Sequence, residues 1–153
     1  MKLRHLPIVF LVVAFAIAVM GQVSADYLAD YNATPYNEST EVAIGDVSFT
    51  IPEGFGEYDD KNATADLPDL GSDKNYAFYI CEDGGKIHIV VVHDFLGMSL
   101  DDIKVDGANR TTINGKEGWS YDKNDLHYFS YVEDNNAVFV GVTNQSRIGS
   151  IIS

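Results

Sequence analysis

The sequence predicts an α+β domain, with a single, mainly antiparallel sheet of six or seven strands and short helices packed on one face. Short runs rich in β-branched and aromatic residues follow one another along the chain. Asn-Gly, Gly-Gly and acidic turn signals separate these runs, and only two short stretches have helical spacing. Strands that succeed one another through tight turns pair in antiparallel fashion, which gives this fold class.

The first 25 residues have the features of a signal peptide. A short positive start precedes an apolar run from residue 6 to 20, and Val23-Ser24-Ala25 offers small residues for cleavage before Asp26. We expect cleavage and export, which leaves 153 − 25 = 128 residues, enough for one domain. The alternative is an uncleaved membrane anchor, although the run is shorter than the roughly 20 residues of a spanning helix.

The mature chain is expected to begin with a polar linker over residues 26–40, followed by a single domain over 41–153. The linker has scattered tyrosines and no apolar period. A first strand is predicted at 47–51, where apolar and polar residues alternate before Pro52. The polar stretch 54–74 predicts a long loop.

A hairpin is predicted next, from two strands over residues 76–81 and 86–93. Gly84 and Gly85 lie between them and tolerate the positive φ that a tight reversal requires. The second strand is apolar on both alternating faces from residue 87 to 92, so we expect it inside the sheet and covered on both sides.

A short helix is predicted from Ser99, which suits an N-cap and precedes an acidic first turn, and Gly107 ends it. The rest of the chain predicts a meander, because Asn114-Gly115 is a strong hairpin signal and further Asn and Asp clusters follow. Its strands are expected at 110–113, 116–121, 126–132 and 137–143, and isoleucines at helical spacing predict a last helix at 147–152.

The mature chain is strongly acidic. Removing residues 1–25 removes Lys2 and Arg4, so the net charge becomes 8 − 23 = −15. Such a charge disfavours nucleic acid and anionic membrane surfaces as partners, and membrane association is expected only if the leader is retained. Cys81 is the sole cysteine, which excludes an intrachain disulfide, and we interpret it as a small buried hydrophobe.

Asparagine sequons suggest a glycosylated surface. Chance would place about one Asn-x-Ser/Thr sequon here, since 10 Asn and 17 Ser plus Thr occur in 153 positions. The sequence has five, and the alternative explanation is that polar loops favour these residue types. The candidate acceptors are Asn32, Asn37, Asn62, Asn109 and Asn144.

Catalytic motifs are absent from the sequence, so we expect no enzyme. There is no Gly-x-Ser-x-Gly, no Ser-x-x-Lys, no phosphate-binding loop with a lysine and no His-x-His or Cys-x-x-Cys. His93, Asp94 and His127 are the residues on which a small extracellular hydrolase would depend, and only their presence supports that alternative.

A weak calcium motif lies in the acidic loop. Asp60, Asn62 and Asp66 place oxygen side chains at spacings typical of the first half of an EF-hand. The second half does not fit, because Ala65 replaces the glycine and Gly71 the bidentate glutamate. We therefore favour a solvated acidic loop, with no cofactor, over a specific calcium site.

Aromatic residues gather on the predicted meander and are the candidate binding residues. In alternation, Trp119 and Tyr121 share one strand face, and Phe129 and Tyr131 share one face of the next strand. At least one of these pairs is expected in the core, and exposed rings would stack on sugars or on another protein. The set comprises Trp119, Tyr121, Tyr128, Phe129 and Tyr131.

A family resemblance rests on three stretches of sequence, at 49–55, 112–119 and 129–136. Together they resemble small exported domains of unknown function from methanogenic archaea. The order of elements is also similar to that of the α+β domains of the PsbP/Mog1 type, whose antiparallel sheet carries helices on one face. The resemblance implies an exported domain of this layout and supplies no catalytic residue.

The sequence thus favours an exported, acidic, non-enzymatic binding or cell-surface module. Its partner is expected to be a cell-surface protein or a glycan. The alternatives are a calcium-stabilised adhesion domain and a small extracellular hydrolase. The protein is expected to be secreted or at the cell surface, and membrane-anchored if the leader is retained.

Overall fold

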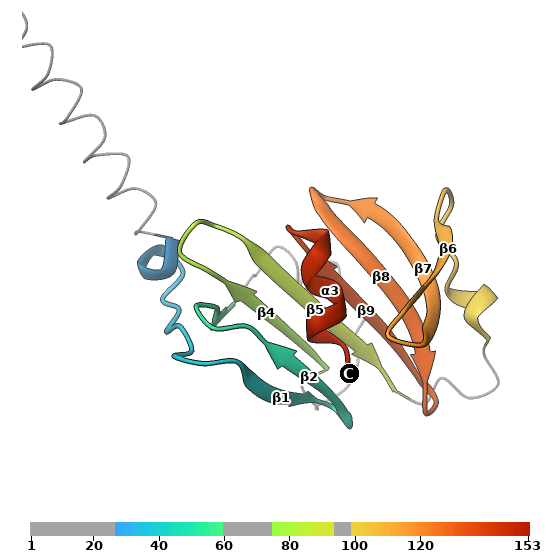
Figure 1. Ribbon diagram of the computed structural model, residues 1–153, viewed down its shortest axis with the longest axis horizontal. Coiled ribbons are helices and arrows are strands. Elements are labelled where there is room, and N and C mark those ends of the chain that lie inside the picture. The colour runs from blue at the N-terminus through green and yellow to red at the C-terminus, as the bar shows by residue number, and fades with distance from the viewer. Residues whose placement is uncertain (1–26, 60–74, 94–98) are drawn as a thin grey trace, which may run out of the picture.

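The structure, a computed structural model, describes residues 27–59, 75–93 and 99–153 (Figure 1). Within these ranges nine strands form two sheets in which every pairing is antiparallel, so the mainly antiparallel arrangement is confirmed and the expectation of a single sheet is corrected. The smaller sheet is a hairpin that was not predicted, made of β1 (Thr40–Ile44) and β2 (Val47–Ile51). The larger sheet has seven strands in the order β3 (Gly56–Tyr58), β4 (Tyr76–Ile80), β5 (Lys86–Val92), β9 (Asn136–Val142), β8 (Leu126–Glu133), β7 (Lys116–Lys123) and β6 (Asn109–Ile113).

Turn chemistry fixes the meander. Three of its turns have both central residues at positive φ, the conformation that matches the twist of a two-residue hairpin. Asn114 has φ of 51° and Gly115 of 76°, so the predicted Asn-Gly turn is confirmed. The other two turns are Asn124-Asp125 and Asp134-Asn135. Because each turn sets the register of its strands, the order of the sheet from β6 to β9 follows directly from local sequence.

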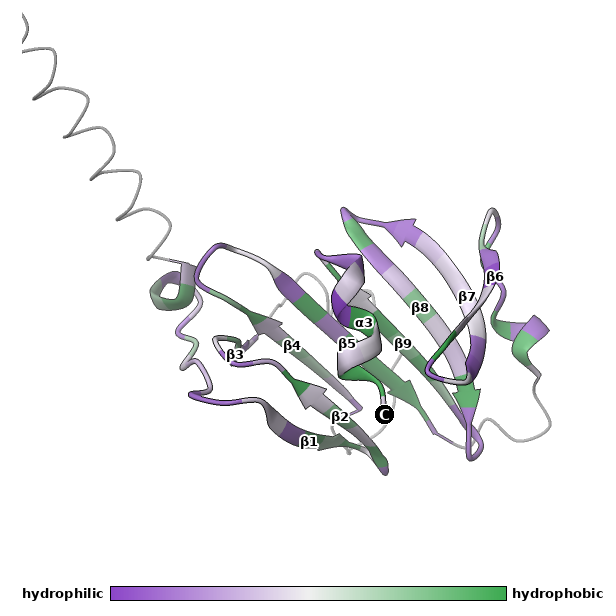
Figure 2. Ribbon diagram, in the orientation of Figure 1, coloured by the Kyte–Doolittle hydropathy of each residue, from purple (hydrophilic) through white to green (hydrophobic). Residues whose placement is uncertain are grey.

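One face of the large sheet, the core face, carries Ile87, Ile89 and Val91 of β5, all at 0% exposure. The β1–β2 hairpin and the short helix α3 (Ile148–Ile151) cover it (Figure 1). Phe49 of β2 forms an isolated bridge with Ile152, which joins the two covering elements. The core face is therefore covered by a hairpin as well as a helix. Figure 2 shows the alternation of hydrophobic and hydrophilic residues along the strands of the large sheet.

The opposite face, the outer face, carries His88 and Val90 of β5. The 3₁₀ helix η1 (Leu100–Ile103) packs on this face through Ile103, which corrects the expectation that the short helices share one face. A second 3₁₀ turn, η2 (Gln145–Arg147), leads into α3. No helix among the described residues is long and apolar enough to cross a membrane.

The segment expected to be a polar linker lies against the domain over its described part. Leu28 and Ala33 pack against the cluster around Phe78 on the outer face. Tyr36 donates its backbone N–H to the carbonyl of Phe55, and its own carbonyl accepts from Gly54. The segment from residue 27 is thus tied to β3 by apolar contacts and backbone hydrogen bonds, and it does not hold the domain away as predicted.

Candidate functional site

Three of the five candidate aromatic residues are buried, which removes them from any contact surface. Phe129 and Tyr131 lie on the core face with exposures of 0% and 1%. Trp119 lies on the outer face but is only 6% exposed, because η1 covers it. Burial raises the pKa of the Tyr131 phenol, as expected for a core hydroxyl.

Trp119 holds η1 against the sheet. Its indole Nε1–H donates to the carbonyl of Leu100 at 2.8 Å. The charged ends of Lys104 and Arg110 lie 5.1 and 5.5 Å from the centroid of its ring, within the range of cation–π contacts. These contacts attach the η1 segment to β7, so the function of Trp119 in the fold is structural.

The remaining two residues, Tyr121 and Tyr128, form a parallel stacked pair on the outer face. Their ring centroids are 5.5 Å apart and their planes differ by 7°. Both side chains are half-buried, and burial raises the pKa of both phenols. The rings remain neutral at physiological pH and keep part of their surface in contact with solvent.

Neighbouring residues position this pair. Tyr121 and Ser130 share a hydrogen bond between their hydroxyl groups at 2.9 Å. The ring of Tyr128 lies over Gly141 of β9, where an added Cβ would come within 2.6 Å of ring atoms. Gly141 is therefore required for the position of Tyr128, because any side chain there would displace the ring.

The pair is the end of a row of residues that crosses the large sheet. In the register, Tyr128 faces Gly141, Gly141 faces His88, and His88 faces Phe78 of β4. The rings of Phe78 and His88 lie 4.5 Å apart, and the Tyr58 hydroxyl lies 2.9 Å from Nε2 of His88. Sequence reasoning missed this row, because it depends on the pairing of β5 with β9, two strands 43 residues or more apart in sequence.

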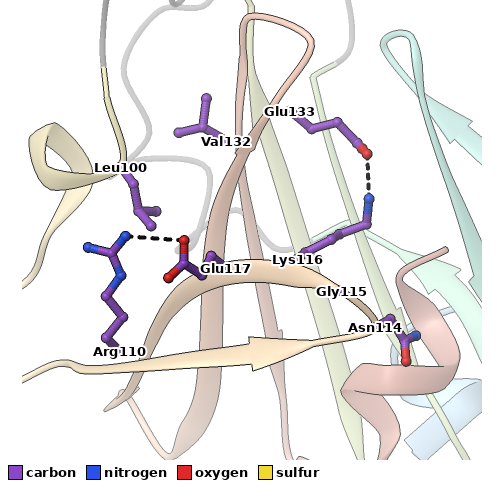
Figure 3. Close-up of a pocket in the computed structure, with 8 residues that line it drawn as sticks. All are labelled: Leu100, Arg110, Asn114, Gly115, Lys116, Glu117, Val132 and Glu133. Atoms are coloured by element: carbon purple, nitrogen blue, oxygen red, sulfur yellow. Dashed lines mark hydrogen bonds and ion pairs between the residues drawn. The ribbon is translucent and has the colours of Figure 1, made fainter.

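A groove of about 480 Å³ lies beside the β6–β7 turn (Figure 3). Arg110 and Glu117 face each other at 3.3 Å, and Asp101 lies 3.6 Å from the same guanidinium. An ion pair between Lys116 and Glu133 occupies the other side. The two cations that line the groove, Arg110 and Lys116, are thus paired with carboxylates of the protein, so the groove offers no obvious site for an anionic ligand. Its lining comprises Leu100, Arg110, Asn114, Gly115, Lys116, Glu117, Val132 and Glu133.

The two histidines of the hydrolase hypothesis lie at opposite ends of the sheet. His93 contacts Asn136 at the start of β9, whereas His127 pairs with Val142 at its end and hydrogen-bonds to Asp122. Six residues of strand separate these positions by about 20 Å. Asp94 lies outside the described residues, and among those described no hydroxyl or thiol is hydrogen-bonded to His93 or His127. The arrangement lacks the nucleophile and base contact of covalent catalysis.

The predicted calcium ligands Asp60, Asn62 and Asp66 lie outside the described residues, as does the sequon at Asn62. Within the described ranges no three His, Cys, Asp or Glu side chains come together as a metal site would require. The other four sequon asparagines are exposed, as N-glycosylation demands. They are Asn32, Asn37, Asn109 and Asn144.

Cys81 is half-buried beside a surface pocket of about 400 Å³. Its thiol donates to a carboxylate oxygen of Asp83 at 2.8 Å. Burial, and then the hydrogen bond to Asp83, raise the pKa of the thiol. A neutral thiol at physiological pH is a poor nucleophile. The half-burial and the hydrogen bond to Asp83 correct the interpretation of Cys81 as a small buried hydrophobe.

Comparisons with family models, with curated protein sequences and with solved structures gave no match for this chain. The resemblances drawn from the sequence therefore stay predictions.

Proposed function

We propose that this chain is an exported, non-enzymatic module that binds a partner at the cell surface through the Tyr121–Tyr128 pair. The observation that carries the proposal is the parallel stacking of two half-exposed rings on the face opposite the core. Held rings lose little conformational entropy on binding, and their surfaces suit sugar rings and apolar protein groups. The N-terminal features of a signal peptide support export.

The charge of the protein narrows the class of partner. With a net charge of −15 after removal of residues 1–25, from 8 cations and 23 acids, the surface repels anionic polymers and membranes. A neutral glycan or a basic protein patch is compatible with this field. The separation of His93 from His127 supports contact over catalysis.

The test measures retention of the mature domain on cell-envelope fractions. Tyr121→Ser and Tyr128→Ser should each weaken retention at temperatures where circular dichroism shows the variant to be folded, because both rings keep part of their surface in contact with solvent. Periodate treatment of the envelope oxidises the vicinal diols of glycans and protease treatment degrades proteins, so the two pretreatments identify the class of partner. Unchanged retention of both variants would contradict the proposal.

Tyr131→Phe is a matched control. Tyr131 lies on β8, as Tyr128 does, but its side chain is buried on the core face. The Tyr131→Phe variant therefore keeps the outer face intact. Loss of retention with Tyr131→Phe alone would place the contact surface elsewhere.

A further inference from the structure

The two edges of the large sheet differ in how they are covered. At the β3 edge, the backbone of Thr34 lies so close that a Cβ on Gly56 would come within 2.7 Å of the Thr34 carbonyl oxygen. At the other edge, no backbone hydrogen bond joins β6 to any described residue outside β7. Within the described residues, one edge is thus covered and a five-residue strand is left open at the other.

The register determines which backbone groups of β6 are available. Ile113 and Lys116 close the two-residue hairpin, a position at which both hydrogen bonds are exchanged within the pair. Since hydrogen-bonded pairs alternate along an antiparallel ladder, Arg110 and Thr112 direct their N–H and C=O groups away from β7. These four groups form a template for one further strand.

Side chains on β6 do not block this template. Thr112 is exposed, Thr111 is half-buried, and the strand has no proline and no lysine, two residues that commonly protect sheet edges. Threonine is also well suited to cross-strand contacts. Arg110 is the one charged side chain on β6, and its charge is compensated by Asp101 and Glu117, so the strand is only weakly protected against pairing with another chain.

Charge near the edge favours a cationic partner. Arg110 lies close to two carboxylates, Asp101 and Glu117, whose side chains are 78% and 62% exposed. Lys104 and Arg110 both lie over Trp119, so two cations balance Asp101 and Glu117 locally, and the negative field at this edge comes from the strong overall acidity of the protein. A lysine opposite Thr112 would be attracted by this field, whereas a second copy of this acidic chain would be repelled.

We propose that β6 binds an extended, basic peptide segment of a partner protein, which pairs antiparallel with it as an eighth strand of the sheet. Main-chain hydrogen bonds to Arg110 and Thr112 would supply the affinity, and the overall acidity of the protein would favour a cation. This site uses the edge of the sheet and does not depend on the Tyr121–Tyr128 pair.

The probe is the capped peptide acetyl-Val-Lys-Val-Thr-Thr-amide, titrated against the unglycosylated mature domain and followed by amide NMR shifts. In antiparallel register its lysine lies opposite Thr112. We expect the largest shifts on β6 and about tenfold weaker binding when the lysine is replaced by glutamate. Shifts centred elsewhere, or equal binding of the glutamate peptide, would overturn the proposal.

Two variants at one position separate the backbone from the side chain. Thr112→Pro removes an outward N–H and should weaken binding about tenfold or more, whereas Thr112→Val keeps the edge and should bind like the parent. Equal binding by Thr112→Pro would refute strand addition. Should Thr112→Pro fail to fold, the peptide with alternate amides N-methylated tests the same point on the parent, and it should not bind.

Dimerisation is a separate outcome that would also overturn the proposal. Sedimentation should show a monomer, because like-charged copies repel. A dimer abolished by Thr112→Pro would assign the edge to a second copy. Retention on envelope fractions that depends on Tyr121 and Tyr128 while the probe fails to bind would refute the edge site and leave the proposed function intact.

Discussion

Replacing Trp119 with phenylalanine tests the conclusion that this residue holds η1 in place and is not a contact residue. Phenylalanine keeps an apolar ring at the same position but lacks the N–H that donates to the Leu100 carbonyl at 2.8 Å. It also offers a smaller aromatic ring to the charged ends of Lys104 and Arg110. The variant therefore removes the attachment of η1 with little change in hydrophobicity.

The expected loss of stability can be built from these contacts. The hydrogen bond contributes about 1 kcal/mol, with some further cost if the Leu100 carbonyl loses its partner. The smaller ring leaves a space that costs about 1 kcal/mol. Cation–π contacts of exposed side chains contribute about 0.5 kcal/mol each, and phenylalanine retains part of that. The total is about 2–3 kcal/mol.

Urea denaturation followed by circular dichroism measures this difference directly. We expect an unchanged slope and a lower midpoint, together with a melting temperature lower by about 10 °C for a domain of this size. Retention on envelope fractions should persist at temperatures where the variant is folded. A loss below about 0.5 kcal/mol would refute the structural role, and retention lost at full stability would return Trp119 to the contact surface.

Three further outcomes follow from the same structure. Gly115→Val should lower the free energy of unfolding, measured by urea denaturation, by about 1–2 kcal/mol, because a β-branched residue resists the φ of 76° at this position. The space around an added Cβ is open, so the loss would come from the backbone alone. An unchanged denaturation midpoint would count against the turn. Iodoacetamide at pH 7.5 should alkylate Cys81 more slowly than free cysteine, because the raised pKa of the Cys81 thiol keeps the thiolate scarce. An equal rate would show a more accessible thiol. Millimolar calcium should raise the melting temperature no more than magnesium does, and a larger rise abolished by Asp60→Ala would instead establish the calcium site.

Local turn chemistry explains why much of the large sheet could be predicted. Asn114 and Gly115 accept positive φ, so the pairing of β6 with β7 is written in adjacent residues. The same holds for β4 and β5, which are joined through Gly84 at φ of 88°. The helix predicted from Ser99 is shorter than expected, a 3₁₀ turn in which the Ser99 backbone N–H donates to Asp102.

Contacts between distant segments could not be predicted in this way. No local signal indicates that β5 pairs with β9, that the β1–β2 hairpin covers the core face, or that the segment from Tyr27 packs on β3. For the same reason, the sequence could not show which of the candidate binding residues are buried. Alternation showed that Trp119 and Tyr121 share a face, but only the position of η1 determines that the first is buried and the second half-exposed.

Hydroxyl-radical footprinting tests whether the Tyr121–Tyr128 pair is the contact surface, because it reports the solvent exposure of each tyrosine in the bound and free protein. The domain is labelled alone and in the presence of a saturating envelope extract, and oxidation is quantified by mass spectrometry. We expect Tyr121 and Tyr128 to become protected, while Tyr27 and Tyr31, exposed at 40% and 38% near the N-terminus, stay equally reactive. Protection of Tyr27 and Tyr31 with no change at Tyr121 and Tyr128 would contradict this expectation.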